Sequence, residues 1–117
     1  IAMERRSNHR VAAYVVPIAD RPKPSRSMSR KAMQEVDLVF GVVIRVSVLN
    51  DKDGMRSRSE LDIARDAIRD QLFAWTPDGA TEGLQLGAGD LMKMEKGTIW
   101  WLDRYLTKCQ RVAKQSQ

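Results

Sequence analysis

Residues 36–48, VDLVFGVVIRVSV, place an apolar side chain at every second position. Successive side chains of an extended strand point to opposite faces, so this alternation predicts a strand with one unbroken apolar face. We expect the strand to span residues 34–48 and to turn this first face toward the core. The first face would hold Val36, Leu38, Phe40, Val42, Ile44, Val46 and Val48.

The second face of the same strand is not simply polar. Asp37 precedes Val39, Gly41 and Val43 on this face, and Arg45 and Ser47 follow them. Two valines and a glycine favour a covering surface over open water, and the glycine permits a bulge or a close approach of neighbouring groups. The sequence leaves open whether a neighbouring subunit or a helix of the same chain provides that cover.

After a turn at NDKDG, residues 50–54, the apolar period changes to three and four residues. The stripe consists of Leu61, Ala64, Ile68, Leu72 and Trp75, which predicts a helix over residues 59–75. A capping box at Ser59 and Asp62 would begin the helix, and Pro77 with Gly79 would end it. The charges between these positions are expected to be solvated; they are Asp62, Arg65, Asp66, Arg69 and Asp70.

The remaining elements complete an α+β pattern. Residues 11–16 form a short strand ended by Pro17, RPKPSRSMSRK at 21–31 forms a basic loop, and EKG joins a hairpin between 91–94 and 98–107. We therefore predict one domain over residues 11–107, with a mainly antiparallel sheet, at least one long helix on one face and a protruding basic loop. Residues 1–10 would be an N-terminal segment and 108–117 a basic tail. The predicted core comprises Val36, Leu38, Phe40, Val42, Ile44, Leu61, Ile68, Leu72, Trp75 and Trp101.

Charge is distributed unevenly along the chain, whose formal net charge is +5. Residues 1–31 hold eight Lys/Arg and two acids, and residues 108–117 hold three basic residues and no acid. The segment between them holds nine basic and thirteen acidic residues. Basic ends on an acidic body are typical of solvated tails, of contact with an acidic protein surface, or of sequence-independent contact with nucleic acid.

No motif for catalysis, metal or cofactor binding is present. The single histidine, His9, is far in sequence from the single cysteine, Cys109, which is expected to be an ordinary thiol. Asp51 and Asp53 resemble the start of a calcium loop, but position 62 holds Asp where a bidentate Glu is expected. No apolar run is long enough to cross a membrane. We predict a soluble, unexported chain with no enzyme activity, no cofactor and no membrane partner.

Five segments in this order resemble the tail terminator proteins of long-tailed bacteriophages and related prophages. They are VAAYVVPIAD, the Pro-rich loop, VFGVVIRVSVLNDKDG, LFAWTPDGATEGLQL and GAGDLMKMEKGTIWWLDRYLT, spanning about residues 11–107. The most specific parts are FGVV at 40–43, the turn with Trp75, Pro77 and Gly79, and Trp100 and Trp101 before Asp103.

The resemblance implies a virion structural protein. Such terminators form a ring, commonly hexameric, that caps the head-proximal end of the tail tube, stops tube polymerisation and joins the tail to the neck. Implied partners are further copies, the tail tube protein, a neck or head-completion protein and, in a contractile tail, a sheath protein; genomic DNA is only passing cargo. Assembly would occur in the bacterial cytoplasm. Family members usually begin with a helix, and whether IAMERRSN lacks it or retains a clipped end stays open.

Two sets of residues are predicted to form the subunit or tube interface. The first is Val39, Gly41 and Val43, with Arg45 supplying an ion pair across the seam. The second is the basic loop, which would become ordered on binding and contains Arg21, Lys23, Arg26, Arg30 and Lys31. Alternative functions are a head–tail connector or tail-completion protein, and a small DNA-binding protein.

Overall fold

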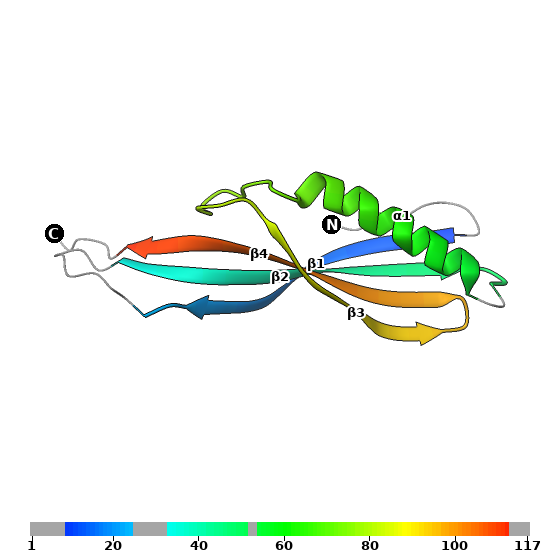
Figure 1. Cartoon of the computed structure of the whole chain (residues 1–117). Helices are drawn as coiled ribbons and strands as arrows, with labels where there is room; N and C mark the ends of the chain where they lie inside the picture. The colour runs from blue at the N-terminus through cyan, green and yellow to red at the C-terminus, as the bar shows by residue number, and fades with distance from the viewer. Residues whose placement is uncertain (1–8, 25–32, 52–53, 113–117) are drawn as a thin grey trace.

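The computed structural model describes residues 9–24, 33–51 and 54–112. They form the strands β1 (His9–Pro22), β2 (Met33–Val48), β3 (Gln85–Glu95) and β4 (Thr98–Val112), and the helix α1 (Met55–Leu72). The strands form one antiparallel sheet in the order β1-β2-β4-β3, and α1 packs on one face of it (Figure 1). The α+β class with a mainly antiparallel sheet is confirmed. No helix in the described ranges is long and apolar enough to span a membrane.

The core lies between α1 and the first face of β2. Val42, Ile44, Val46 and Val48 are all buried there, as the alternation predicts. They pack with residues of three other elements, Val11, Leu61, Ile99 and Tyr105, and the partly buried Phe40, Ile68, Leu72 and Trp101 pack against this cluster. Removing this apolar area from water is the main term that holds the helix to the sheet.

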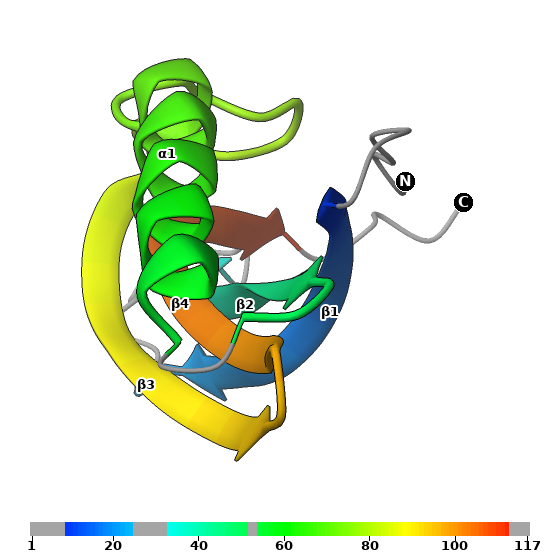
Figure 2. The ribbon, with the colours of Figure 1, turned by 90° about the vertical axis from the view of Figure 1, so that its right-hand side faces the viewer.

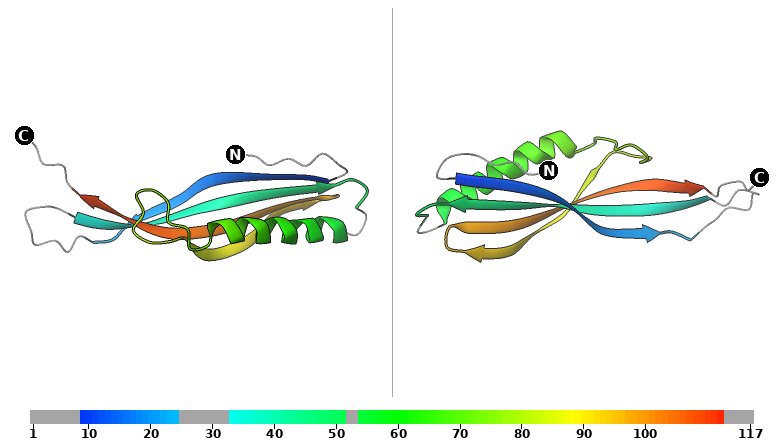
Figure 3. Two further views of the ribbon diagram at one scale, coloured as in Figure 1. Left: turned by 90° about the horizontal axis from the view of Figure 1, so that it is seen from above. Right: turned by 180° about the vertical axis from the view of Figure 1, so that it is seen from behind.

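The molecule is elongated, with extents of 63 × 23 × 21 Å. With 18 residues, α1 is only about 27 Å long, so it covers less than half of the long axis. Figure 2, viewed along the sheet, shows the strands curving around one side of α1, and Figure 3 shows the strands β1, β2 and β4 continuing past the helix. Along this extension the sheet has no helix on either face within the part of the chain that the structure describes.

The helix begins and ends earlier than the sequence predicts. It starts at Met55 rather than Ser59, because Gly54 adopts a left-handed conformation (φ 77°) that turns the chain into the first helical turn. The predicted capping box is replaced by Asp51, whose carboxylate accepts hydrogen bonds from the Ser57 N–H (2.9 Å) and hydroxyl (2.7 Å). The helix ends at Leu72, so Trp75 lies beyond it.

Two strands are longer than predicted. β1 continues through Pro17 with a register shift and reaches Pro22, which an edge strand permits because proline's missing N–H can face away from the sheet. β4 continues to Val112, so residues 108–112, expected in a tail, pair with residues 33–37 of β2. Residues 1–8 and 113–117, and most of the predicted basic loop, lie outside the described residues.

Gly97 closes the β3–β4 hairpin in a conformation that requires glycine. Its φ is +70°, and an added Cβ would lie 2.5 Å from the Val48 carbonyl oxygen, a backbone atom that cannot easily move. Gly79 has a similar φ of +84° but open space around it.

We expect Gly97→Ala to lower the free energy of unfolding by about 2–3 kcal/mol, since it combines backbone strain with a steric clash, and Gly79→Ala by only about 1 kcal/mol. Urea denaturation of both variants measures the difference. Equal losses would show that the contact with Val48 relaxes at no cost.

Candidate functional site

The sheet face opposite α1, called the outer face here, is a candidate contact surface. On β2 it carries Val39, Gly41, Val43 and Arg45. Their neighbours in register are Ala12, Tyr14 and Val16 of β1, and Trp100, Leu102, Arg104 and Leu106 of β4. Figure 1 shows α1 and the loop that follows it on the other side of the sheet. No described helix or loop lies over the outer face. Ala12 and Val39 are nevertheless buried (5% and 8% exposed), so the surface open to a partner is formed mainly by the partly or fully exposed Tyr14, Val43, Trp100 and Leu102.

Gly41 lies at the centre of the outer face. A Cβ at this position would lie 2.5 Å from Leu102 Cδ1 and 2.8 Å from Ile18 Cδ1, so side chains of both flanking strands close over the glycine. The apolar surface is therefore continuous from β1 across β2 to β4. The sequence predicts a close approach of neighbouring groups at Gly41, and in the structure these groups are side chains of its own sheet.

Arg45 is an unpaired charge on this face. Its guanidinium lies 5.6 Å from the ring centroid of Trp100, a cation–π contact, and its Nε is buried without a hydrogen-bond partner. Arg45 makes no salt bridge with any residue in the described ranges. A buried guanidinium N–H without a partner costs free energy, which an acceptor on another chain would recover.

The structure divides the predicted basic loop. Arg21 is the penultimate residue of β1, and the Lys23 backbone N–H donates to Glu35, so both belong to the β1–β2 hairpin. The Lys23 ammonium lies 3.0 Å from the Glu35 carboxylate and 3.6 Å from that of Asp37. Lys23, aided by Lys108, holds the pKa of Glu35 below its usual value. Arg26, Arg30 and Lys31 lie outside the described residues.

The predicted core residues lie on the α1 side, with one exception. Val36, Val42, Ile44 and Leu61 are buried, and Leu38, Phe40, Ile68, Leu72 and Trp101 are partly buried. Trp75 was predicted in the core but is 53% exposed, because the helix ends at Leu72 and its stripe does not reach position 75. Phe73, next to it, is also exposed.

An ion-pair network between α1 and β4 was missed by the sequence interpretation. Asp103 is 3% exposed and accepts hydrogen bonds from Arg65 Nε (2.9 Å) and Nη2 (3.0 Å) and from the Trp101 indole (2.8 Å). Arg69 lies 3.7 Å from the same carboxylate, and Arg65 stacks over the Trp101 ring at 4.5 Å. The prediction that Arg65 and Arg69 are solvated surface charges is wrong, because both turn toward a carboxylate on the inner face of the sheet.

The sequence did contain a signal for this network. Asp103 alternates with Ile99, Trp101 and Tyr105, so it lies on the same apolar strand face and needs a cation. Arginines four residues apart on a helix can both reach one such site. The Asp103 hydrogen bonds hold the pKa of Arg65 above its ordinary value.

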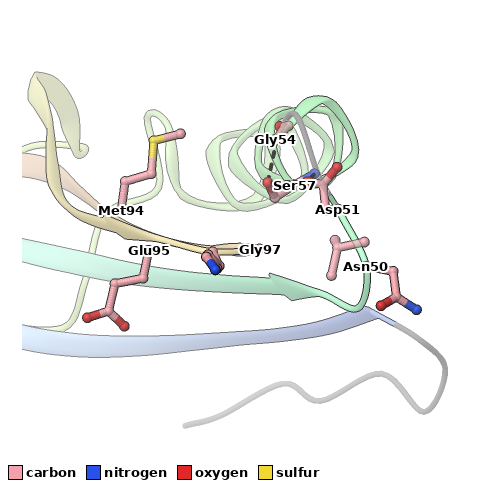
Figure 4. A pocket seen from close by; sticks show the side chains of 9 residues that line it. Asn50, Asp51, Gly54, Ser57, Met94, Glu95 and Gly97 are labelled. Carbon is pink, nitrogen blue, oxygen red and sulfur yellow. Dashed lines mark hydrogen bonds between the residues drawn. The ribbon is translucent and has the colours of Figure 1, made fainter.

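A hollow of 690 Å³ lies where the β2–α1 turn faces the β3–β4 hairpin (Figure 4). Its lining includes Asp51, Ser57, Met94, Glu95 and Gly97. No group of three potential metal ligands occurs among the residues that the structure describes. The Asp51 carboxylate is already used by Ser57 and by the Arg56 N–H (3.3 Å), so it holds the start of α1 rather than a ligand.

The Asp51 contacts make stability depend on pH. Hydrogen bonds from the Ser57 side chain and backbone lower the pKa of Asp51. A lowered pKa in the folded state means a contribution that is present above the unfolded value, about 4, and is lost as the pH falls through the folded pKa. We expect Asp51→Asn to be destabilised relative to the parent at neutral pH, with the difference shrinking below about pH 4. Urea denaturation at several pH values measures it; a difference independent of pH would contradict this role.

The geometry describes a two-layer α+β protein with a largely apolar sheet face over which no described helix lies, and comparison with protein families identifies its class. The family model described as phage tail terminator protein matches residues 2–115. The chain therefore belongs to the phage tail terminator family and is a structural component of a phage tail. Comparison with curated proteins finds no match.

Proposed function

We propose that this chain forms a ring that caps the head-proximal end of the tail tube, stops tube polymerisation and offers a surface to neck or head-completion proteins. The family match over residues 2–115 carries this proposal. The outer face supports it, since a ring subunit must present apolar surface to its neighbours in addition to the surface that it buries in its own core.

The outer face also contains the residues that we assign to the interface. The continuous apolar strip includes Val39, Gly41 and Val43. The buried Arg45 Nε–H is a hydrogen-bond donor without an acceptor in the described chain. We assign these residues to the contact with a neighbouring subunit, with Arg45 donating to an acidic group across the seam. The basic residues at positions 21–31 would then contact the last ring of the tube or the next subunit.

The direct test is tube growth in vitro. Tail tube protein from the same genome is allowed to polymerise with and without this protein, and tube lengths are measured by electron microscopy. A terminator shortens the tubes at substoichiometric ratios and is seen at one end. A head–tail connector, the runner-up within the same assembly, would leave the length distribution unchanged.

The positive net charge of +5 favours one further candidate, a small DNA-binding protein. In that case the protein would bind duplex DNA with a steep salt dependence, and deletion of residues 21–31 would abolish binding. The pairing of Lys23 with Glu35 and Asp37 argues against a DNA contact by Lys23, because its charge is already neutralised within the hairpin. A terminator ring through which DNA passes needs only weak contacts with that DNA, so strong duplex binding is not expected of it.

A further inference from the structure

Beyond its first turn, the exposed charged residues of α1 are all aspartates, whereas the first turn also exposes Arg56 and Arg58. Asp62, Asp66 and Asp70 are spaced four residues apart, so they form one line along the helix, and all three are exposed. Ile63, 56% exposed, lies beside this line. None of the three aspartates makes a salt bridge with a described residue, so their charge is available to a partner.

The acidic line exists because the two arginines that follow Asp62 on the helix point the other way. Arg65 and Arg69 lie between these aspartates in sequence and would neutralise them on a fully solvated helix. Both instead turn inward to the buried Asp103. The fold therefore separates the charges of residues 62–70, with Arg65 and Arg69 turned inside and the three aspartates outside. Like charges four residues apart disfavour the helix, and a cationic surface placed over them would relieve that repulsion.

The opposite side of the molecule carries the complementary surface. Arg10 and Arg45 lie on the outer face near each other, since Ala12 pairs with Arg45 and Arg10 pairs with Ser47. Neither makes a salt bridge with a described residue, and Trp100 adds an apolar surface next to Arg45. This end of the sheet is the end that α1 covers on the inner face, so the acidic line and the arginines lie on opposite sides of one two-layer unit (Figure 2).

We propose that copies of this chain contact head to tail, with the acidic line of α1 of one copy seated on the outer face of the next. Asp62, Asp66 and Asp70 would meet Arg10 and Arg45, and Ile63 would pack on the apolar strip beside Trp100. The outer face would then receive the same kind of cover that α1 gives to the inner face.

The arrangement fits the requirement for closure. A contact between two different surfaces of identical subunits forms a ring when the rotation between successive copies closes, whereas a contact of one surface with itself stops at a dimer. The inference rests on the proposed ring and adds which two surfaces form it. In this arrangement an aspartate of α1 in the neighbouring copy accepts a hydrogen bond from the Arg45 Nε–H.

Sedimentation velocity of the full chain, alone and with tail tube protein, tests the proposal through two charge-reversal variants. The helix variant is Asp66→Lys/Asp70→Lys, and the face variant is Arg10→Glu/Arg45→Glu. Each is expected to lose the parent's oligomer, because the reversed charges now face like charges. An equimolar mixture is expected to recover it, since every contact in an alternating ring then joins opposite charges.

The matched control is Asp20→Lys/Asp78→Lys, which changes the net charge by the same amount as the helix variant at exposed sites off α1. It should assemble like the parent, and circular dichroism checks that all variants are folded. A helix variant that assembles normally would overturn the head-to-tail contact and leave the proposed ring intact. A parent that stays monomeric, alone and with tube protein, would overturn both.

Discussion

Replacing Asp103 by Ala is expected to lower the free energy of unfolding by about 3–5 kcal/mol. The carboxylate is 3% exposed and accepts both hydrogen bonds of Arg65 and one from the Trp101 indole. Removing it leaves Arg65 and Arg69 facing each other beneath the helix with no anion between them, so their desolvation is no longer compensated. The loss also weakens the main polar link between α1 and β4.

Asp90→Ala provides the control, because it removes an Asp–Arg pair from the same sheet in a solvated setting. Asp90 pairs with Arg104, and its side chain is 61% exposed. An exposed pair of this kind contributes only about 0–1 kcal/mol. Urea denaturation of both variants gives the comparison. If Asp103→Ala cost no more than Asp90→Ala, the network would be a surface feature, and the inward orientation of the arginines would have no energetic basis.

Tyr105→Ala should be destabilised by a similar amount, about 3–5 kcal/mol, through a cavity in the core. Tyr105 is 0% exposed and is among the largest fully buried side chains. Its ring stacks on Phe40 at a centroid distance of 5.6 Å, so truncation removes contacts with β2 as well as with α1. Thermal unfolding followed by circular dichroism measures the loss.

Tyr105→Phe separates the ring from its hydroxyl. The hydroxyl is buried with no hydrogen-bond partner in the described chain, and burial raises the pKa of this phenol. Deleting a buried polar atom that has no partner is expected to change stability by less than about 1 kcal/mol. A Phe variant as unstable as the Ala variant would mean that the hydroxyl, rather than ring packing, provides the contribution of this residue.

The parts of the fold that follow from local pattern were predictable. The alternation at 36–48 predicts β2 and its buried face, and the sequence EKG predicts the β3–β4 turn. Both patterns depend only on residues that are neighbours in the chain. Helix ends were harder. The start at Met55 depends on the left-handed Gly54 and on Asp51 accepting from Ser57, a combination of loop geometry and side-chain chemistry that no periodic pattern reports.

The strand face shared by Val39, Gly41 and Val43 was predictable from the alternation on β2, and their role in a subunit contact stays a prediction. The positions of the α1 arginines were not predictable. Arg65 and Arg69 were misplaced because a charged residue on a helix is solvated by default, and only pairing with β4 shows that Asp103 lies beneath them. The acidic line of Asp62, Asp66 and Asp70 follows from that pairing, so it could not be derived from α1 alone.

The most direct test of the ring is the mass of the assembly. Light scattering or mass photometry of the purified protein, alone and with tail tube protein, measures it without further assumptions. We expect the mass of a closed ring of several copies, formed in solution or at the tube end. A strict monomer that ignores tube protein but binds duplex DNA with a steep salt dependence would contradict it.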